Sequence, residues 1–305
     1  PTAAYGVFHK VDEAKEFIAQ TGAPIVVKAD GLAAGKGVVV AMTIEEANAA
    51  VEDMLSGNRF GDAGSTVVIE EFMEGEEASL LAFVDGKTVV PMIASQDHKR
   101  IFDGDKGPNT GGMGTYAPAP VLTDALRDEA MKTILEPMVA AMEKEGMPYM
   151  GCLYAGLMIT PQGPKVVEFN ARFGDPETQV VLPLLDSDLG QIMMACATGT
   201  LTADMVKWKD SSAACVILAS KGYPETSSKG DVIHGDIKQH DTTIVFHSGT
   251  KLVGDEYVTN GGRVLGVVGL GKDLRTALDR AYGRIEHIDF EGMQYRTDIG
   301  AKAFK

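Results

Sequence analysis

The chain has 305 residues, of which 45% are hydrophobic, so it is long enough for two or three domains with well-buried cores and shows no compositional sign of disorder. A formal net charge of −15 excludes a broadly basic surface, so we expect no nucleic-acid partner and expect any anionic ligand to be met by a few local cations. No apolar run approaches the roughly 20 residues that span a bilayer, and no signal pattern opens the chain, so we expect a cytoplasmic protein without a membrane partner.

The first 75 residues mix helices with hairpins. Apolar spacing and turn signals predict, in chain order, a helix over residues 11–20, strands over 25–27 and 38–41, a helix ending at Leu55 and a strand over 67–72. Gly22 is placed to end the first helix. Thr43, with Glu46 three residues later, predicts a capping box at the start of the second helix.

The middle of the chain follows a different order. The patterns predict strands over residues 80–84 and 88–93, a loop over 103–118, a helix from near Thr123, strands over 153–159 and 165–169, and a helix over 188–197 that ends at Gly199. Asp85 and Gly86 suit a tight hairpin turn, and Pro137 must kink or split the long helix. We interpret the glycine- and proline-rich stretch 103–118 as a binding loop, because so long a loop inside a compact domain is usually functional or mobile.

Beyond Lys209 short strands predominate. We predict strands over residues 213–219, 243–248 and 263–269, with turn signals between them, and one amphipathic helix from near Asp273. This pattern is typical of a separate, mostly β domain.

The cysteines and most histidines suggest no special chemistry. Cys152, Cys196 and Cys215 lie far apart in apolar stretches, so we expect small buried side chains and neither a disulfide nor a zinc framework. Apart from His98, the histidines are scattered without metal-ligand spacing and receive no role.

A glycine-rich loop with a lysine at each end lies between two predicted strands. It does not fit the P-loop, which needs four residues between its glycines, Ser or Thr after the lysine and a following helix. A flexible β-hairpin flap remains, in which Gly35 and Gly37 let backbone N–H groups approach phosphate oxygens and Lys28 and Lys36 supply point charges. Taken alone, the loop fits an ordinary hairpin with solvated lysines equally well.

Five acidic residues lie within residues 70–77, at the end of an apolar strand. Such a cluster is usually a solvated strand edge, and taken alone the segment fits that interpretation better. The functional alternative is a hinge between subdomains, whose backbone pairs with an adenine edge while a carboxylate holds the ribose hydroxyls.

Residues 165–177 carry the most informative pattern. Side chains alternate along a strand, so Glu168, Asn170 and, if the strand extends so far, Arg172 point to one face. Two oxygen ligands and a guanidinium suit a magnesium nucleotide, because Mg²⁺ prefers hard oxygen ligands and Arg can donate two parallel hydrogen bonds to a phosphoryl group in transfer. A merely polar outer strand face does not favour Asn in mid-strand, so we favour function here.

A fourth cluster, Asp97, His98, Lys99 and Arg100, precedes the glycine-rich stretch 107–114. Three potential cations beside a glycine loop fit an anionic substrate. A basic run on the surface explains them equally well.

Taken together, these segments closely resemble the phosphoribosylamine–glycine ligases, also called glycinamide ribonucleotide synthetases, of the ATP-grasp superfamily. The resemblance runs nearly end to end and is most specific at residues 28–37, 95–100, 107–114 and 172–179, the last of which is similar to the family's signature. It implies an α+β ATP-grasp fold, in which two α+β subdomains enclose the nucleotide, followed by a small mostly-β domain. The corresponding boundaries are residues 1–75 for the small subdomain, 76–209 for the large subdomain and 210–305 for the C-terminal domain.

The resemblance also implies a reaction. ATP phosphorylates the carboxylate of glycine, and the amine of 5-phosphoribosylamine attacks the glycyl phosphate, giving glycinamide ribonucleotide, ADP and phosphate in de novo purine biosynthesis. The protein mainly positions the reactants and neutralises charge. The implied cofactors are ATP and Mg²⁺ or Mn²⁺, the implied partners are glycine and 5-phosphoribosylamine, and we expect a monomer.

The family pattern assigns roles to individual residues. In this pattern the ATP phosphates are bound by Lys28, Gly35, Lys36 and Gly37. The adenine is contacted by Glu70, Glu71, Phe72 and Met73, and the ribose by Glu77. The metal is bound by Glu168 and Asn170. Lys28 and Arg172 are the catalytic residues of this scheme, with Arg172 steadying the developing charge. The resemblance further suggests Asp175 and Glu177 for the glycine amine. It suggests Asp97, His98, Lys99 and Arg100, with Asn109, Gly111 and Gly112, for the sugar phosphate.

Two departures from the family pattern bear on these roles. The strand at residues 152–160 carries no acid, so the number of metal ions stays open. The family has a further N-terminal domain ahead of the ATP-grasp module, and because this sequence starts after it, at Pro1, we expect ATP binding to survive better than complete turnover. The alternatives are an ATP-binding module that is inactive without that domain and another ATP-grasp carboxylate–amine ligase, which domain add-back and a substrate panel distinguish.

Overall fold

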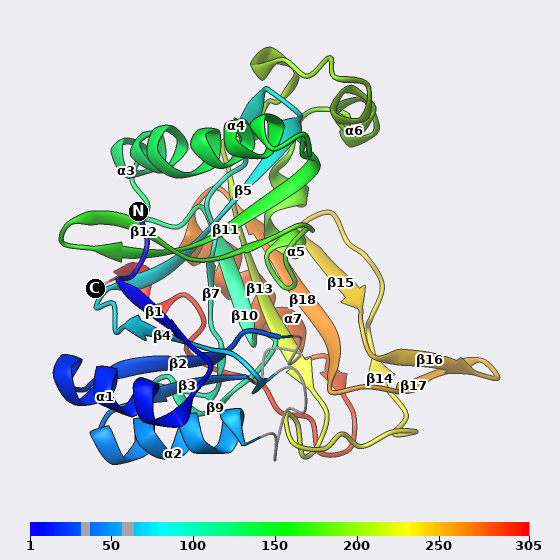
Figure 1. Ribbon diagram of the computed structural model, residues 1–305. Coiled ribbons are helices and arrows are strands. Elements are labelled where there is room, and N and C mark those ends of the chain that lie inside the picture. The colour runs from blue at the N-terminus through cyan, green and yellow to red at the C-terminus, as the bar shows by residue number, and fades with distance from the viewer. Residues whose placement is uncertain (32–36, 57–63, 305) are drawn as a thin grey trace. The chain divides into compact units, whose positions relative to one another are not determined.

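The computed structural model describes residues 1–31, 37–56 and 64–304 (Figure 1). The chain divides into two compact units. The first unit comprises Pro1–Gly75 and Lys165–Val167, and the second comprises Glu76–Pro164 and Glu168–Lys305. Helices and strands are mixed in both units, which confirms the predicted α+β class.

The first unit is a four-stranded antiparallel sheet with two helices. Its elements are β1 (Tyr5–Phe8), α1 (Val11–Thr21), β2 (Ile25–Ala29), β3 (Val38–Ala41), α2 (Ile44–Leu55) and β4 (Val67–Glu71), and the strand order is β1-β4-β2-β3. The predicted capping box is confirmed, since the Thr43 side chain accepts from the Glu46 backbone and the Glu46 side chain accepts from the Thr43 backbone. Gly22 ends α1, with its N–H bonded to the Ile18 carbonyl.

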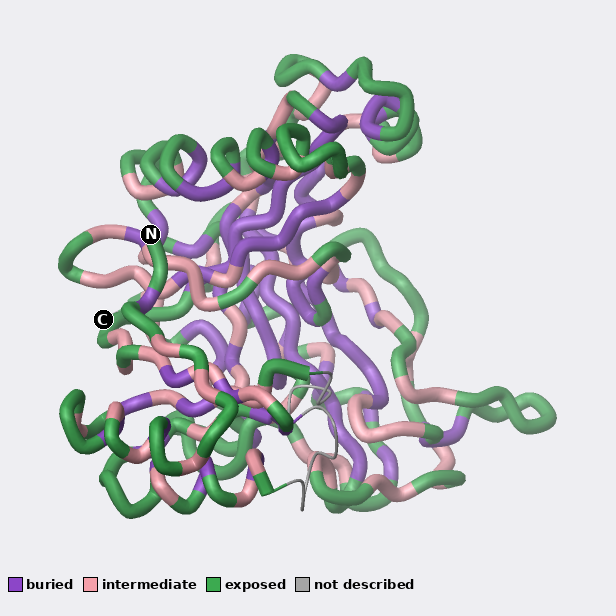
Figure 2. The backbone as a smooth tube through the Cα atoms, in the orientation of Figure 1, coloured by how far each residue is buried: buried purple, intermediate pink, exposed green. Residues whose placement is uncertain are grey.

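Strand alternation gives this sheet two different faces. Ile25 and Val27 of β2 and Val67 and Ile69 of β4 are buried in a core that α1 and α2 also line (Figure 2). The intervening side chains lie on the opposite face and are only half-buried or exposed. One face therefore supplies the hydrophobic core, and the other remains open within this unit.

The second unit begins with another four-stranded sheet, of order β12-β11-β5-β6. Its strands are β5 (Glu76–Asp85), β6 (Val89–Pro91), β11 (Met150–Thr160) and β12 (Gly163–Asn170), of which Lys165–Val167 are counted with the first unit. The hairpin predicted at Asp85-Gly86 is confirmed by the pairing of β5 with β6, and the strands predicted over residues 153–159 and 165–169 are confirmed as β11 and β12, which pair with each other. The long helical run is α3 (Asp124–Ala130), a π-helical turn (Met131–Leu135) and α4 (Glu136–Lys144). Pro137 therefore does not break the run; it lies at the start of α4, directly after the π turn.

A five-stranded antiparallel sheet, of order β15-β18-β13-β10-β7, forms the rest of the second unit. Its strands are β7 (Gln96–Asp97), β10 (Gly114–Ala117), β13 (Ser212–Ala219), β15 (Thr243–His247) and β18 (Arg263–Gly271). Because β7 and β10 precede residue 209 and the other strands follow it, this sheet joins the regions that we placed in separate domains. The division at residue 209 stays a prediction.

The prediction of an uninterrupted loop over residues 103–118 is wrong. The stretch contains β9 (Lys106–Asn109), which pairs with β8 (Arg100–Phe102), and β10, which lies between β7 and β13. Strand β10 is fully buried and pairs with residues about a hundred positions later in the chain. Glycine and proline dominate the local composition, so the partner strands rather than local propensity determine this strand.

The remaining elements are two helices of 10 and 12 residues, one helix of 4 residues, short strands and 3-10 turns. They are α5 (Thr178–Val181), α6 (Leu189–Thr198), α7 (Leu274–Ile285), β14 (His234–Gly235), β16 (Thr250–Val253), β17 (Glu256–Thr259), β19 (Ile288–Asp289) and 3-10 turns at Leu182–Leu184, Ala203–Met205 and Ala301–Phe304. Asp188 caps α6 by accepting from Gln191 N at 3.0 Å, and Gly199 ends it in the left-handed conformation with φ 70°. No helix in the described part of the chain is long and apolar enough to cross a membrane.

All three cysteines are buried, as predicted, and none is bonded to another. Cys152, Cys196 and Cys215 belong to one hydrophobic cluster of the second unit. Burial, with a smaller contribution from Cys196, raises the pKa of Cys152 to about 12. These thiols therefore serve as small core side chains.

Candidate functional site

The open face of the first unit's sheet carries an ion pair on an apolar surface. Lys28 Nζ lies 2.6 Å from Glu70 Oε2, and both side chains are about one fifth exposed. The strand register places Val26 beside Glu70 and Val68 beside Lys28 on this face. The structure thus pairs Lys28 with Glu70, two residues that the resemblance gives to different parts of ATP, on a surface whose valines offer apolar contact to a flat ligand.

Of the loop that the sequence predicts as a flap, residues 32–36 lie outside the described part of the chain. Gly35 and Lys36, predicted to approach phosphates, lie outside the described residues. Gly37 is buried, and its carbonyl accepts from Ala29 N at 2.8 Å, which extends the pairing of β2 and β3 to the end of the loop.

The segment predicted to line an adenine follows β4 without regular structure. Phe72 and Met73 are half-buried. Glu71 Oε2 accepts from Ala4 N at 3.1 Å, and this hydrogen bond is the main cause that lowers the pKa of Glu71. The Glu71 carboxylate is therefore engaged within the unit, so any contact of this residue with a base would use its backbone.

The predicted metal ligands lie side by side at the end of β12. Asn170 Nδ2 donates to Glu168 Oε1 at 3.2 Å, which confirms that the two side chains share a strand face. Within residues 64–304, Asn170 Oδ1 and the second Glu168 oxygen accept no hydrogen bond, although the Glu168 charge acts on Lys99. A Cβ at Gly156 of the neighbouring strand would lie 3.3 Å from Glu168 Cγ, so a glycine there leaves room for the glutamate.

This pair fits a divalent cation. It offers one carboxylate and one amide oxygen, the hard donors that Mg²⁺ prefers, and Mg²⁺ commonly keeps water and phosphate oxygens as its other ligands. Among the residues that the structure describes there is no cluster of three or more His, Cys, Asp and Glu side chains, so an all-protein cage is not formed. The strand ends at Asn170, and Arg172 lies in the following bend with its Nη1 donating to Phe173 O at 2.9 Å. The strand therefore does not extend far enough to place Arg172 on its face.

A pair of carboxylates lies in the interior of the second unit. Glu177 is 4% exposed, and its Oε1 accepts from Ser79 Oγ at 3.0 Å and from Tyr154 Oη at 2.9 Å. Asp97, on β7, is half-buried, and its Oδ1 accepts from His98 N at 2.7 Å. Burial and then the charge of Glu177 raise the pKa of Asp97 well above its usual range.

Lys99 adds a cation to the same region. Burial by itself would lower the pKa of Lys99, but the hydrogen-bonded Glu77 carboxylate, together with Asp97 and Glu168, holds it above its ordinary value. Glu77, suggested for the ribose, is thus paired with Lys99 here. The charge of Lys99 is thus balanced by the carboxylates around it, so Lys99 would have to exchange Glu77 for an anion that enters this region.

His98 and Arg100 differ from the simple basic run that the sequence suggested. Burial, with Arg296 and Lys302 nearby, lowers the pKa of His98 to about 4, so the ring is neutral. Its Nδ1 lies 3.2 Å from Gly114 O, and its Nε2 accepts from Gly300 N at 3.4 Å. Arg100 is exposed and donates to Gly107 O at 2.7 Å. His98 therefore holds backbone in the core, whereas Lys99 and Arg100 retain positive charge.

Arg263, at the start of β18, is a residue that the sequence analysis missed. Its Nη1 donates to Gly111 O at 2.7 Å and to Asp175 O at 2.9 Å, and its Nη2 lies 3.0 Å from Asp175 Oδ2. The Arg263 guanidinium thus links strand β18 of the five-stranded sheet to the glycine-rich stretch, residues 107–114, and to the signature segment, residues 172–179. No local pattern marks this arginine, because each partner lies more than 80 positions away in the chain.

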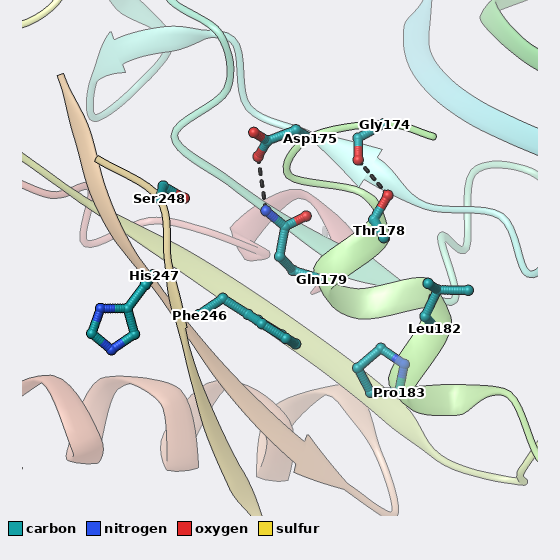
Figure 3. Close-up of a pocket in the computed structure, with 9 residues that line it drawn as sticks. All are labelled: Gly174, Asp175, Thr178, Gln179, Leu182, Pro183, Phe246, His247 and Ser248. Carbon is teal, nitrogen blue, oxygen red and sulfur yellow. Dashed lines mark hydrogen bonds between the residues drawn. The ribbon is translucent and has the colours of Figure 1, made fainter. Parts of the chain in front are cut away.

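Asp175 is occupied by protein groups on both oxygens. Gln179 Nε2 donates to Asp175 Oδ1 at 2.8 Å, as Figure 3 shows, and Arg263 takes the other oxygen. Asn109 pairs with Arg100 between β9 and β8, and Gly112 packs against the Asp97 carboxylate. The structure therefore brings Asp97, Lys99, Gly112 and Glu177 together.

A cavity of about 760 Å³ adjoins the signature segment (Figure 3). Asp175, Thr178 and Gln179 line one side, and Phe246, His247 and Ser248, at the end of β15, line the other. Among the described residues that line it, none is Lys or Arg, so this cavity offers a phosphate no cationic side chain.

Comparisons with known proteins give a consistent result. Residues 1–178 match the phosphoribosylglycinamide synthetase ATP-grasp (A) domain, and residues 213–302 match the C domain of the same family. The phosphoribosylamine–glycine ligase of Neisseria meningitidis serogroup A is 54% identical over 99% of this chain and 72% of its own length, and that of Caulobacter vibrioides is 56% identical over 100% and 72%.

Solved structures extend the similarity to the fold. The crystal structure of phosphoribosylamine–glycine ligase from Thermotoga maritima aligns with a TM-score of 0.88 and 35% identity over 98% of this chain and 74% of that chain. The biotin carboxylase domain of the Hydrogenobacter thermophilus 2-oxoglutarate carboxylase aligns with a TM-score of 0.74 over 97% of this chain and 64% of that chain, but at 17% identity the likeness concerns the fold alone.

Proposed function

This chain belongs to the phosphoribosylglycinamide synthetase family of ATP-grasp ligases, and from that premise we propose how its residues join glycine to 5-phosphoribosylamine in de novo purine biosynthesis. The reaction consumes ATP and gives glycinamide ribonucleotide, ADP and phosphate. The observation that carries the proposal is the segment from Glu168 to Glu177, which has an oxygen-donor pair at one end and a buried carboxylate at the other.

In the first unit, we assign the nucleotide to the open face of the sheet. The valines beside Lys28 and Glu70 offer apolar contact to a purine, and the backbone of residues 70–73 offers hydrogen-bonding groups. Lys28 supplies a positive charge for phosphate oxygens, with Glu70 holding its ammonium group in place. Gly35, Lys36 and Gly37 of the flap complete this assignment.

In the second unit, we assign Mg²⁺ or Mn²⁺ to Glu168 and Asn170. When bound, the cation supplies charge neutralisation for the phosphoryl group in transfer. Arg172 follows the pair directly, and its guanidinium is suited to the same oxygens because it presents a fork of N–H donors. We assign Glu77 to the ribose hydroxyls.

The chemistry then needs two transfers. An oxygen of the glycine carboxylate attacks the γ-phosphorus of ATP, and ADP leaves. The neutral amine of 5-phosphoribosylamine attacks the carbonyl carbon of glycyl phosphate, a C–N bond forms, phosphate leaves, and the nitrogen loses a proton. The residues mainly orient these groups and stabilise charge, which ligation through an acyl phosphate requires.

For the sugar phosphate we propose the region around Lys99 and Arg100, with Asn109, Gly111 and Gly112 nearby. Two cations with backbone N–H groups of a glycine-rich stretch suit a phosphate monoester. Asp97 lies within this region, and neutral His98 supports it through Gly114. Glycine itself we assign to the neighbourhood of Glu177 and not to the Asp175 carboxylate that the resemblance also suggested, because both oxygens of Asp175 are bonded to Gln179 and Arg263.

Phosphate release tests this function directly. The chain is supplied with Mg-ATP, glycine and freshly prepared 5-phosphoribosylamine, and each component is omitted in turn. We expect release only when all are present, and a panel of other carboxylates and amines should give none. Release that depends on a different carboxylate or amine would identify another ATP-grasp ligase instead.

A further inference from the structure

The hairpin formed by β8 and β9 has few apolar contacts to hold it in place. Of the three residues of β8 only Ile101 is buried, and all four residues of β9 are exposed. Its turn is polar and strongly curved, with positive φ at Gly104 and at Asp105. Burial of apolar surface therefore contributes little to the position of this hairpin, and polar contacts must hold it.

A buried arginine near the end of the chain bonds to this hairpin. Arg296 is 1% exposed, and its Nη1 donates to Arg100 O at 3.1 Å and to Asp105 Oδ1 at 2.9 Å. Its Nε and Nη2 donate to the two oxygens of Asp298 at 2.7 and 2.8 Å, and Asp298 Oδ2 also accepts from Gly104 N at 2.8 Å. The guanidinium thus reaches the hairpin directly at strand and turn, and indirectly through a second carboxylate.

Two neighbouring residues strengthen the same contact. Lys302 Nζ lies 2.6 Å from Asp105 Oδ2, and Thr297 N donates to Asp103 Oδ1 at 2.9 Å. Thr297 Oγ1 donates to the other oxygen of Asp103. Both acids of the turn are therefore bound by the C-terminal segment, residues 296–302.

Helix α7 fixes this C-terminal segment in turn. Tyr282 Oη donates to Arg296 O at 2.9 Å and accepts from Ile299 N at 3.1 Å. Ile299 is 2% exposed and belongs to the hydrophobic cluster that α7 lines. The segment therefore gives the polar hairpin a support that is itself anchored in the core.

The backbone of Asp105 shows how much the turn depends on this support. Its φ is 53°, and among the described residues it is the one non-glycine residue with a positive φ. Left-handed backbone favours glycine, as at the adjacent Gly104. The two oxygens of Asp105 bind Arg296 and Lys302, so its ion pairs offset the less favourable backbone conformation.

The charges of this contact stay fixed near neutral pH. Burial by itself would raise the pKa of Asp105 and of Asp298. Hydrogen bonds from Lys302 and Arg296 nevertheless hold the pKa of Asp105 below its ordinary value. Arg296 has the same effect on the pKa of Asp298. Two carboxylates thus balance two cations, and removal of the buried cation would leave its partners uncompensated.

The supported backbone carries residues of the proposed sugar-phosphate region. Arg100, whose carbonyl Arg296 holds, lies opposite Asn109 in the hairpin. The adjacent Lys99 O accepts from Thr110 N at 2.7 Å, where the hairpin leads into the glycine-rich stretch. A shift of the hairpin would therefore displace these groups, and a misplacement of about 1 Å is enough to impair substrate binding or catalysis strongly.

We propose that Arg296 is a positioning residue for the acceptor substrate, because it holds the β8–β9 hairpin in the place where Arg100 and Asn109 meet the sugar phosphate. Arg296 does not itself touch substrate, since its side chain is buried and four hydrogen bonds to protein oxygens engage its donors. This inference rests on the proposed function and adds a residue outside the site that sets the site's geometry.

Steady-state phosphate release by the whole chain tests this role, with each substrate varied in turn. In Arg296→Met we expect the KM for 5-phosphoribosylamine to rise roughly 10-fold, with kcat and the KM for ATP within about twofold of the unaltered chain. Asp105→Asn should raise the same KM about threefold, since asparagine also tolerates left-handed backbone and only the ion pairs are lost. The double variant should raise it by less than the product of the two single effects, because both residues act through one contact.

Binding of glycinamide ribonucleotide provides a second readout that needs no turnover. This compound carries the same ribose phosphate and is titrated calorimetrically into the unaltered chain and the variants. We expect its Kd to rise by the same factors as the KM for 5-phosphoribosylamine. Hydrogen exchange at the Gly104 and Thr110 amides should become faster in Arg296→Met, which locates the effect in the hairpin.

Arg284→Met is the matched control. Arg284 is a second buried arginine of the same unit, bonded to the Asp236 carboxylate and to Lys238 O, and neither partner lies in the hairpin. Its replacement should destabilise the unit but leave the KM for 5-phosphoribosylamine unchanged. If Arg296→Met does not fold, Asp105→Asn still decides the question, because the Asp105 side chain is 38% exposed at a turn.

Three results would overturn the positioning role. They are an unchanged KM and Kd in both Arg296→Met and Asp105→Asn, an equal rise in Arg284→Met, and no binding of glycinamide ribonucleotide by the unaltered chain. Phosphate release that requires all substrates, with an unchanged KM in the variants, would reject the positioning role and leave the ligase function standing. No release, with glycinamide ribonucleotide bound more weakly by the variants, would reject the ligase function of this chain and leave the positioning role standing.

Discussion

Replacing Arg263 by methionine should destabilise the second unit, because four hydrogen bonds from one guanidinium are lost together. Arg263 Nη1 donates hydrogen bonds to Gly111 O at 2.7 Å, to Gly112 O at 3.4 Å and to Asp175 O at 2.9 Å, and Nη2 donates to Asp175 Oδ2 at 3.0 Å. The side chain is 20% exposed, so these bonds are largely shielded from water. Methionine keeps much of the apolar stem and removes every donor.

The expected loss follows from the state of the acceptors. The Asp175 carboxylate is half exposed and can regain water, so its ion pair contributes roughly 0–1 kcal/mol. The two short bonds to backbone carbonyls contribute about 1–1.5 kcal/mol each, since their donor is charged and their partners are left unsatisfied. We therefore expect a loss of about 2–4 kcal/mol in the free energy of unfolding, and about half of that for Arg263→Lys.

Urea unfolding followed by circular dichroism measures this loss, and hydrogen exchange at the Gly111 and Gly112 amides locates it. Arg280→Met is the matched control, because Arg280 in the same unit makes one hydrogen bond, to Leu270 O at 2.5 Å, and should cost about 1 kcal/mol or less. Equal unfolding curves for the two methionine variants, with unchanged exchange at the glycines, would refute the reasoning.

Four further predictions concern single side chains. Glu168→Gln should abolish magnesium-dependent ATP binding while leaving the circular dichroism spectrum intact, and unchanged nucleotide affinity in a titration would contradict the metal assignment. Arg172→Lys should leave ATP binding unchanged but slow phosphoryl transfer at least tenfold in rapid-quench measurements, because an ammonium group cannot replace the bidentate hydrogen bonds of a guanidinium. A normal rate would show that Arg172 does not stabilise the phosphoryl group in transfer. Thr43→Ala should cost about 1 kcal/mol in thermal unfolding through loss of the capping box, more than Thr43→Ser does. His98 is neutral when folded, because its pKa is lowered from 6.5 to about 4, so the unfolded chain binds more protons between these two pH values. The free energy of unfolding should therefore fall by about 3 kcal/mol as pH drops from 6.5 to 4. His98→Asn should make acid unfolding depend less on pH in this range, and an unchanged dependence would show that other groups cause it.

The sequence by itself determined the features that depend on neighbouring residues. The capping box at Thr43, the end of α6 at Gly199, and the shared face of Glu168 and Asn170 all follow from spacings within a single helix or strand. Helical and strand periodicity is local, so such patterns can be recognised without the fold. The same is true of the family motifs, which are contiguous segments.

Only the tertiary structure decided the features that depend on distant segments. Strand β10 has a loop-like composition and becomes a buried strand through β7 and β13, and Arg263 meets partners more than 80 positions away. Burial, which no local pattern reports, turned His98 from a potential cation into a neutral core residue. Asp97 and Glu177, 80 positions apart in the chain, become a carboxylate pair for the same reason: charge and pKa depend on which groups the fold brings together and how much water it leaves beside them.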